Sequence, residues 1–546
     1  MKKKIINNKY IILFFAILFL LNVPNISKTF GNWDLNLEQN IVLSNIKQYS
    51  QMLKINEIVK YCDDIDVQYI SINDDKDHGV ALYYMALPII LIRESLPEIS
   101  AYLWNFYTFI IFFIGVICFY KLMILLYKDK KIAIIMTLLY YLNPRIFIDA
   151  IHNSKDLSLM TLIIIDTYLV AKIIKEQNNK DMILFAIISA FLCNIKIIGI
   201  FFAFILGLTY VIYLIINKKI NKQNLFDILF IIVLTIAIYI VITPAIWSGG
   251  KIELISFIKY CLKRDSKFGW TGSVLFEGKK YIVLTKNLPL YYLPKFILIT
   301  MPIMINLLFI IGVIILIVGI IVKSIKKKKI ILSDYIAVSS LINFLVPFIL
   351  YFTLKPIIYN GWRHFYFLYS SIIIIASFAL NSLLKIKKYY LKNIVLAVCI
   401  ISLSYSLFSI VKYGVANTAY YNILVGNKDI SSEYEMDPYA VTTKDAFWSF
   451  VKSEKISEYD RIYLYANERE YLHNSSILDT LLIRGFREKY KIVLVNDKNI
   501  DKYIKAKKKI YIFSNTSFIN SDPSKYKLVY SYKIRNNRII NFYIYN

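Results

Sequence analysis

A dense acidic stretch stands directly before an apolar run in the first hundred residues. Residues 75–79 read DKDHG, and the apolar run 80–92 follows at once. If that run enters a membrane, Asp75, Asp77 and His78 stand at the water boundary. A base acting on a lipid-linked substrate must stand at this depth, because the reactive bond lies among the headgroups while the lipid tail stays in hydrocarbon. The alternative is a solvated acidic loop.

Residues 143–156 form a second concentration of polar groups, between two apolar stretches. Its ionisable members are Arg145, Asp149, His152, Lys155 and Asp156. Such groups are costly at a membrane boundary unless they pair or bind something. The basic members could hold a phosphate, and the two carboxylates could orient them or bind a metal. The alternative is a salt-bridge cluster at two helix ends.

Two further places carry basic side chains beside apolar runs. Lys196 is a lone cation between Ile195 and Ile197, and it either snorkels to the membrane surface or neutralises a phosphate. Arg363 and His364 follow a Trp, which is typical of an interface anchor. An Arg and His pair also suits a diphosphate or phosphosugar headgroup.

The elements that position these residues must be membrane spans. Of the 546 residues, 58% are hydrophobic and 19% are charged, and the mean hydropathy is +0.53. No soluble domain has this composition. The net charge of +28 comes largely from short basic clusters between apolar runs, which is typical of cytoplasmic loops and argues against nucleic-acid binding. The clusters are residues 2–4, 128–131, 172–180, 218–222, 323–329 and 385–392.

Holding those clusters in the cytoplasm predicts roughly eleven crossings of about 20 residues each. The first apolar run, 10–23, is then a retained anchor, because no small-residue cleavage site follows it. Nearly every candidate residue falls on the opposite side of the membrane. The outside segments are 31–101, 143–156, 194–199, 247–293 and 355–363.

Beyond residue 413 the hydrophobic runs shorten and alternate, which predicts strands. The predicted strands are 461–466, 491–495, 509–513, 527–532 and 538–545, with a helix at 443–453. We therefore predict a polytopic α-helical membrane domain over residues 1–412, with its first outside loop at 30–100. A small extracytoplasmic α/β domain follows over 413–546. The expected location is the plasma or inner membrane, with the active site outside.

Several runs resemble, in order and spacing, motifs of the bacterial family 39 type of glycosyltransferases. The runs are 75–80 (DKDHGV), 143–147 (NPRIF), 153–156 (NSKD), 196–199 (KIIG), 288–292 (LPLYY), 359–364 (YNGWRH) and 435–439 (EMDPY). These enzymes belong to the GT-C superfamily, with the protein mannosyltransferases and the aminoarabinose transferases of lipid A. The resemblance implies a GT-C-like fold and transfer of a hexose or pentose from a polyprenyl-phosphate donor. The acceptor would be a glycan, a lipid or a protein at the outer membrane face.

In that family an acidic residue of the first outside loop acts as the base or organises the acceptor. Asp75 and Asp77 occupy the matching stretch. Residues 37–39 (LEQ) stand where the family has an Asp-Glu pair, so Glu38 is a third candidate. The expected reaction inverts the anomeric centre, with pre-positioned cations stabilising the phosphate charge as it develops. The expected substrate-binding residues are His78, Arg145, His152, Lys155, Asp156, Lys196, Arg363 and His364.

Two other functions stay open from the sequence. A transporter or flippase for a lipid-linked solute would show internal repeats, broken spans and charged groups near mid-membrane. An inactive relative would use its outside domain to bind a partner. The plentiful carboxylates are compatible with a divalent metal, but no spacing requires one.

Overall fold

The computed structural model describes most of the chain. The described residues are 2–29, 33–57, 59–60, 77, 79–248, 251–267, 272–285, 287–426, 428–439, 441–457, 460–465, 491–515 and 526–545. Two predicted site residues, Asp75 and His78, lie outside them.

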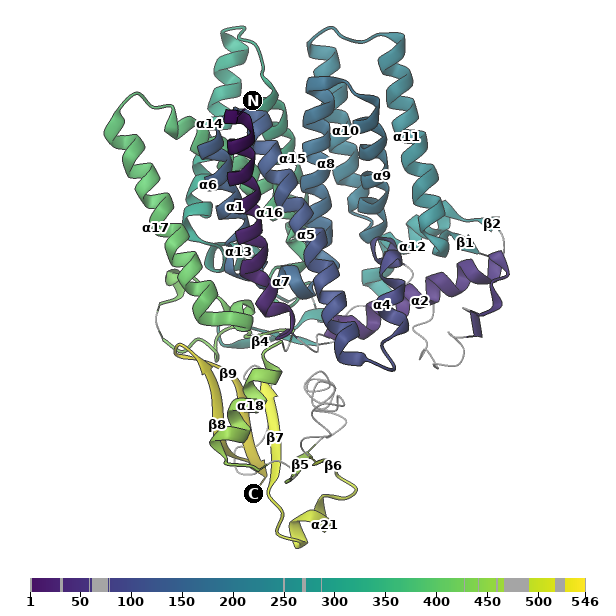
Figure 1. Ribbon diagram of the computed structural model, residues 1–546, viewed down its shortest axis with the longest axis vertical. Helices are drawn as coiled ribbons and strands as arrows, with labels where there is room; N and C mark the ends of the chain where they lie inside the picture. The colour runs from purple at the N-terminus through teal and green to yellow at the C-terminus, as the bar shows by residue number, and fades with distance from the viewer. Residues whose placement is uncertain are drawn as a thin grey trace.

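Long apolar helices make up the bundle (Figure 1). In the described part of the chain, nine helices are long and apolar enough to cross a membrane. They are α1 (Lys2–Ile26), α5 (Pro97–Tyr127), α8 (Asp156–Glu176), α10 (Gly199–Ile216), α11 (Lys222–Ile242), α14 (Ile303–Ile325), α15 (Leu332–Leu354), α16 (Phe367–Leu384) and α17 (Tyr389–Tyr413). Helices α6 (Lys130–Tyr141) and α7 (Pro144–His152) form a pair bent by 66°. Helix α9 (Asn179–Ile195) has 17 residues and runs beside α8 and α11. With the bent pair counted as one span, the described part of the chain has up to ten spans against the roughly eleven predicted, and the polytopic helical fold is confirmed.

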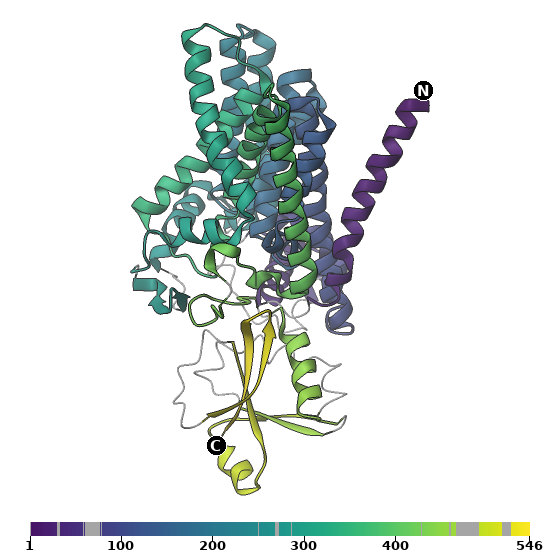
Figure 2. The same cartoon turned by 90° about the vertical axis from the view of Figure 1, so that its left-hand side faces the viewer.

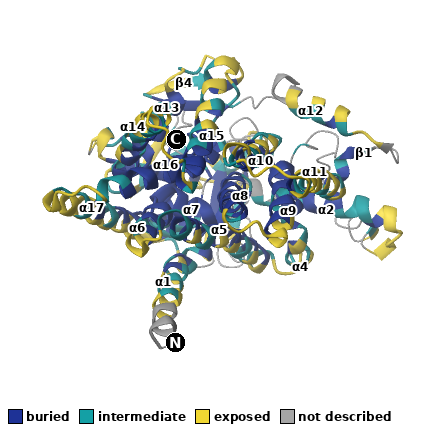
Figure 3. Ribbon diagram, turned by 90° about the horizontal axis from the view of Figure 1, so that it is seen from above, coloured by how far each residue is buried: buried dark blue, intermediate teal, exposed yellow. Residues whose placement is uncertain are grey.

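Burial divides the spans into an inner and an outer set. Of the most apolar stretch of each helix, 89% of the residues are buried in α8 and 83% in α16, but only 11% in α11. Figure 3 accordingly shows α8 and α16 dark at the centre. The outer helices expose Ile, Leu and Phe side chains, which suits contact with lipid, and helices satisfy their own backbone hydrogen bonds in that solvent.

The two ends of the bundle differ in charge and content (Figure 1). The N-terminus and the short basic connections after α5, α8, α10, α14 and α16 lie at one end, which we call the basic end. The other end, called the site end, carries the predicted outside segments and, beyond them, the C-terminal sheet. Which end faces the cytoplasm stays a prediction.

Short elements cover the site end. Helix α2 (Trp33–Leu53), which the sequence did not predict, lies across this end and packs its Val42 and Leu43 with Trp104 of α5 and residues of η1. The other elements are η1 (Ala81–Ala86), α4 (Leu87–Leu91), η2 (Pro244–Ile246), β1 (Trp247–Ser248), β2 (Lys251–Ile252), α12 (Leu254–Lys267), β3 (Ser273–Phe276), β4 (Lys279–Ile282), η3 (Val283–Thr285), α13 (Tyr292–Thr300) and η4 (Arg363–Phe365).

The chain after α17 forms a small α/β unit beside the site end (Figure 2). Its elements are η5 (Gly414–Ala419), η6 (Ile423–Val425), α18 (Thr443–Ser453), β5 (Arg461–Tyr465), β6 (Lys491–Val495), α21 (Ile500–Lys505), β7 (Ile510–Asn515), β8 (Tyr526–Ile534) and β9 (Asn537–Tyr545). The strand order is β6-β5-β7-β9-β8, with β5 parallel to β6 and β7 and the other pairs antiparallel. Phe450 of α18 stacks on Phe542 of β9 with ring centroids 4.4 Å apart. All five predicted strands and the predicted helix are present, while the exact domain boundaries stay predictions.

Candidate functional site

A break between α6 and α7 begins the site. Pro144 is the first residue of α7, and because proline lacks an N–H and restricts the residue before it, α6 ends and the chain turns by 66°. Helical spacing then puts Arg145, Asp149 and His152 near one another. Asp149 accepts a hydrogen bond from the Tyr366 hydroxyl at 2.6 Å and lies 3.3 Å from His152 Nε2. All of these side chains are buried.

Arg145 is held between two distant segments of the chain. Its Nε donates to the Tyr420 carbonyl at 2.9 Å, and its guanidinium lies 4.6 Å from the centre of the Tyr421 ring. A Cβ atom on Gly361 would lie 3.3 Å from Arg145 Nη1. Gly361 also has φ +70°, a backbone conformation that side chains rarely adopt. Glycine at this position therefore allows both this conformation and the close approach of Arg145. Among the described residues Arg145 Nη2 has no hydrogen-bond partner, so this buried cation keeps a donor for a ligand.

An ion pair joins the start of α8 to the turn between α9 and α10. Lys196 Nζ donates to Asp156 Oδ1, and Asn153 Nδ2 donates to the other carboxylate oxygen at 3.2 Å. The side chain of Asn153 also accepts the Asp156 N–H at 2.9 Å. The turn 153–156 therefore fixes the carboxylate that Lys196 faces, and Lys196 pairs rather than simply snorkelling.

Arg363 and His364 lie near this pair, and the charge of Arg363 acts on Asp156. The Arg363 guanidinium lies 5.1 Å from the ring centres of both Tyr359 and Tyr439. Burial, with the charge of Arg363 next, holds the pKa of His364 well below its ordinary value. His364 is therefore a neutral imidazole at pH 7, and it does not add a second cation to Arg363 as the sequence suggests.

Lys155 completes the basic group, since its charge also reaches His364. The predicted residues Lys155, Asp156, Lys196, Arg363 and His364 thus come together from three separate stretches of the sequence. Arg145, Asp149 and His152 line the adjoining face of α7.

Glu38 lies against this group from the first loop. It is buried in α2, and its Oε2 accepts a hydrogen bond from the Ser154 hydroxyl. Tyr83 of η1 braces the same turn, because its hydroxyl donates to the Ser154 carbonyl at 3.1 Å. Glu38 is therefore next to the turn that carries Lys155 and Asp156.

Asp77 is half-buried and lies two residues before Gly79. The latter packs directly on Asn194, whose Oδ1 accepts the Ala81 N–H at 3.1 Å. This packing brings residues 79–81 to the turn that contains Lys196. Of the three candidate bases, Glu38 thus lies beside the turn of Lys155 and Asp156, and Asp77 stands two residues before the contact of Gly79 with Asn194.

Tyr439 is one of the site residues that sequence reasoning missed. Its phenolic oxygen accepts a hydrogen bond from Asn153 Nδ2 at 2.6 Å, and its ring meets that of His152 with centroids 4.6 Å apart. Its only signal in the sequence is the run 435–439, which belongs to the family resemblance. Within the described part of the chain, no group of three or more His, Cys, Asp or Glu side chains is arranged to hold a metal.

An apolar groove opens on the side of the bundle near the site. It has a volume of about 440 Å³ and is lined by residues of α8 to α12, from Ile200, Cys193 and Leu254 toward Tyr210. Cys193 lies three residues before Lys196, so one end of the groove adjoins the basic group. From Ile200 to Val211 the α10 wall is about 16 Å long.

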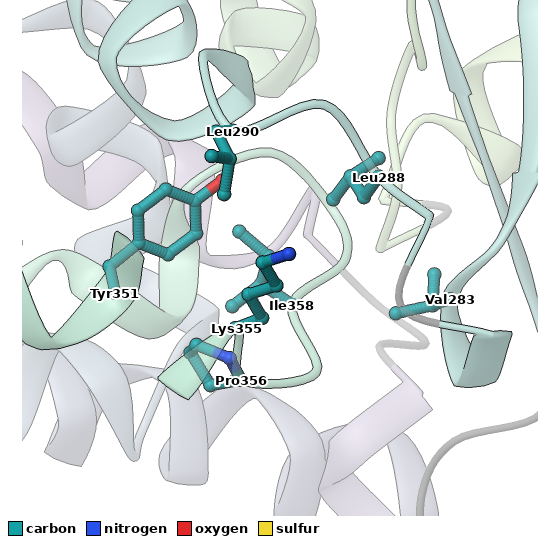
Figure 4. A pocket seen from close by; sticks show the side chains of 7 residues that line it. All are labelled: Val283, Leu288, Leu290, Tyr351, Lys355, Pro356 and Ile358. Atoms are coloured by element: carbon teal, nitrogen blue, oxygen red, sulfur yellow. The ribbon is translucent and has the colours of Figure 1, made fainter. Parts of the chain in front are cut away.

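A second, smaller cleft lies at the end of α15 (Figure 4). Tyr351, Lys355 and Ile358 line it, facing Val283 and Leu288. None of the predicted site residues lines this cleft, which leaves the basic group around Asp156 as the candidate site.

Comparisons with known proteins add a likeness in structure. No family model matches the chain, and no curated protein matches it. Among solved structures, the chain is similar to ArnT from Cupriavidus metallidurans bound to undecaprenyl phosphate, with 10% sequence identity and a TM-score of 0.41 over 98% of each chain.

Proposed function

We propose that this protein is an inverting glycosyltransferase that moves a sugar from a polyprenyl-phosphate donor to an acceptor at the outer face of the membrane. The observation that carries the proposal is the basic group at the site end. Lys196 pairs with Asp156 at the end of the spans, the charge of Arg363 also acts on Asp156, and the charge of Lys155 reaches the neighbouring His364. A lipid phosphate reaches this depth, and cations held in place by protein contacts suit its negative charge, which increases when the sugar leaves.

The apolar groove supports a lipid-linked donor. Its lining is almost wholly hydrocarbon, and one end lies near Lys196. A polyprenyl tail in the groove would place its phosphate among the cations, and burial of the tail would contribute about 25 cal/mol per Å² of apolar surface. The tail and the headgroup would thus be recognised by adjoining parts of the molecule.

The reaction that fits this arrangement is a single displacement. A carboxylate removes the proton of an acceptor hydroxyl, and the oxygen attacks the anomeric carbon. The bond from that carbon to the phosphate oxygen breaks, and the polyprenyl phosphate leaves with the bonding electrons. The cations stabilise the charge that develops on the phosphate, an effect of about 3 kcal/mol for each well-placed donor.

Glu38 is the carboxylate we favour as the base. Its contact with Ser154 puts it beside the turn that carries Lys155 and Asp156. Asp156 itself is engaged by Lys196 and Asn153, which suits an orienting role better than proton removal. Asp77 and Asp75 remain the alternatives that the family resemblance favours.

The orientation of the bundle in the membrane follows from the charge of the basic end. The basic end carries the Lys clusters between spans, and such clusters prefer the cytoplasm. The site end and the C-terminal unit then face outward, where the acceptor glycan, lipid or protein would be met.

The donor site can be tested by binding. Undecaprenyl phosphate should raise the Tm of the purified full-length protein in detergent, and undecaprenol, which lacks the phosphate, should do so much less. Lys196→Met should remove most of the difference between the two lipids, while Lys323→Met at the basic end should keep it. Equal stabilisation by both lipids in the wild type would contradict a phosphate site.

A further inference from the structure

The segment between α17 and α18 reaches back into the candidate site. We call residues 414–442 the connector. Tyr439 of the connector is buried, and it touches three residues of the site: Asn153 by a hydrogen bond, His152 by ring contact and Arg363 by a cation–π contact. A part of the chain outside the bundle therefore contributes to the wall of the site.

These contacts form a relay to the lysine. The amide Nδ2 of Asn153 donates both to the Tyr439 oxygen at 2.6 Å and to Asp156 Oδ2 at 3.2 Å. The other oxygen of Asp156 pairs with Lys196. Since an amide nitrogen has two N–H groups, the Tyr439 oxygen fixes the rotation of the Asn153 amide and, through it, the carboxylate.

The same ring also orders the second cation. Arg363 lies between the rings of Tyr359 and Tyr439, 5.1 Å from each centre. A guanidinium held between two aromatic faces keeps its charge but loses freedom of movement. Tyr439 thus contacts one cation directly and the other through two residues.

The backbone around Asp437 holds Tyr439 in place. Asp437 has φ +29°, which is uncommon for a residue with a side chain. Its carboxylate accepts the N–H groups of Val441 and Thr442 at 3.1 and 2.7 Å, and the hydroxyl of Thr418 donates to it at 3.2 Å. The turn is therefore fixed from both sides of Tyr439.

We propose that Tyr439 is a positioning residue that sets the geometry of both cations, so that the connector is part of the donor site. The role in donor binding rests on the proposed function, but the chain of contacts from Tyr439 to Lys196 can be measured without any donor. It assigns the chain after α17 a role at the membrane site in addition to its own sheet.

The test uses the labelling rate of Lys196 in the full-length protein. A small amine reagent such as acetic anhydride modifies only the unprotonated amine, and peptide mass spectrometry reports the rate at each lysine. Tyr439→Phe keeps the ring and removes the oxygen that fixes the Asn153 amide. Asp156 should then hold the Lys196 ammonium less firmly, and Lys196 should react about three to ten times faster at pH 8. Tyr434→Phe, in the same connector but packed on Phe276 and Phe296, should leave the rate unchanged.

A double variant separates the relay from a general loosening. Asn153→Ala alone should raise the rate as Tyr439→Phe does, and the two together should add nothing further, because they break one chain of contacts. Additive effects, or a rate in Tyr439→Phe within twofold of wild type, would overturn the inference.

Binding of undecaprenyl phosphate distinguishes the two proposals. Tyr439→Phe should weaken it about three- to tenfold, and Tyr439→Leu more, since the Arg363 contact is lost as well. If the wild type binds no polyprenyl phosphate, the proposed function fails, and the lysine labelling still decides the relay. If the lipid binds Tyr439→Phe and wild type equally, the positioning role fails while the donor site stands.

Discussion

Gly79 lies against the backbone of Asn194 so closely that a Cβ atom on residue 79 would stand 1.6 Å from the Asn194 carbonyl oxygen. No side chain can occupy that position without moving one of the two segments. The contact ties the strip that holds Asp77 to the turn that holds Lys196, and so joins the first loop to the basic group.

We therefore expect Gly79→Ala to displace the first loop and to lower both the Tm and any transfer activity. Gly319→Ala is the matched control, because nothing lies within 4 Å of the Cβ it would add. In that half-buried helix position, with space for a methyl group, alanine should be neutral or stabilising by up to about 1 kcal/mol. Thermal unfolding in detergent measures both variants, and equal Tm values for the two would show that the Gly79 contact is not tight.

The ion pair of Asp156 and Lys196 has a counterpart at the basic end. Asp334 and Lys323 pair at 2.5 Å, and each pair combines a buried carboxylate with a partly exposed lysine. Removing one partner of a buried pair costs about 3–5 kcal/mol, less where the lysine reaches water.

Asp156→Asn and Asp334→Asn should consequently lower the Tm by similar amounts. Only Asp156→Asn should reduce undecaprenyl phosphate binding, because only that carboxylate positions a cation of the site. A comparable loss of binding in Asp334→Asn would mean that the ion pair matters for folding alone.

Glu435 gives a pH dependence with a defined sign. Burial raises its pKa to about 8, with the charge of Arg145 and backbone N–H groups opposing the shift. A carboxyl that ionises near pH 4.5 when unfolded and near 8 when folded binds more protons in the folded state. Its contribution to stability is therefore complete below pH 4.5 and is lost as the pH rises through 8.

Glu435→Gln keeps the neutral shape and should flatten the fall in Tm between pH 5 and 8. The protonation of Glu435 contributes up to about 5 kcal/mol to the free energy of unfolding. Thermal unfolding across this range is the measurement, with Glu454→Gln on the surface of the C-terminal unit as the control. A wild-type Tm that rises over this range would contradict the assignment.

Much of the fold follows from hydropathy. The spans are long and apolar because lipid surrounds them, and short apolar runs predicted the five strands, of which β8 and β9 pack against α18. Helix α2 was missed because its mixed composition has neither signal, although it carries Glu38. The neutral state of His364 could not be read from the sequence, since it depends on burial.

The sequence predicted which residues belong to the site better than it predicted how they pair with one another. Arg145, Lys155, Lys196 and Arg363 stand out because charge is rare at the ends of apolar runs. The link between Asn153 and Tyr439 spans 286 residues, and no local pattern predicts a contact that depends on how the C-terminal unit docks.

The orientation of the bundle is open to chemical labelling. Cysteines placed at exposed positions of the two ends, Lys327→Cys at the basic end and Lys505→Cys in α21, should react with a membrane-impermeant reagent from opposite sides of sealed vesicles. We expect Lys505→Cys to react in intact cells and Lys327→Cys only after the membrane is opened. The unmodified protein gives the background from its native cysteines, and labelling of both from one side would overturn the threading.

The most direct test of the proposed function is sugar transfer itself. Purified full-length protein in vesicles would receive radiolabelled polyprenyl-phosphate sugars together with membrane extract as a source of acceptors. Wild type would be compared with Glu38→Gln, Asp77→Asn and Asp75→Asn, with Glu176→Gln at the basic end as a control. The account predicts time-dependent transfer with inversion at the anomeric carbon, lowered at least about 100-fold in Glu38→Gln and kept in the control. Absence of transfer from every donor, with the protein folded, would contradict it.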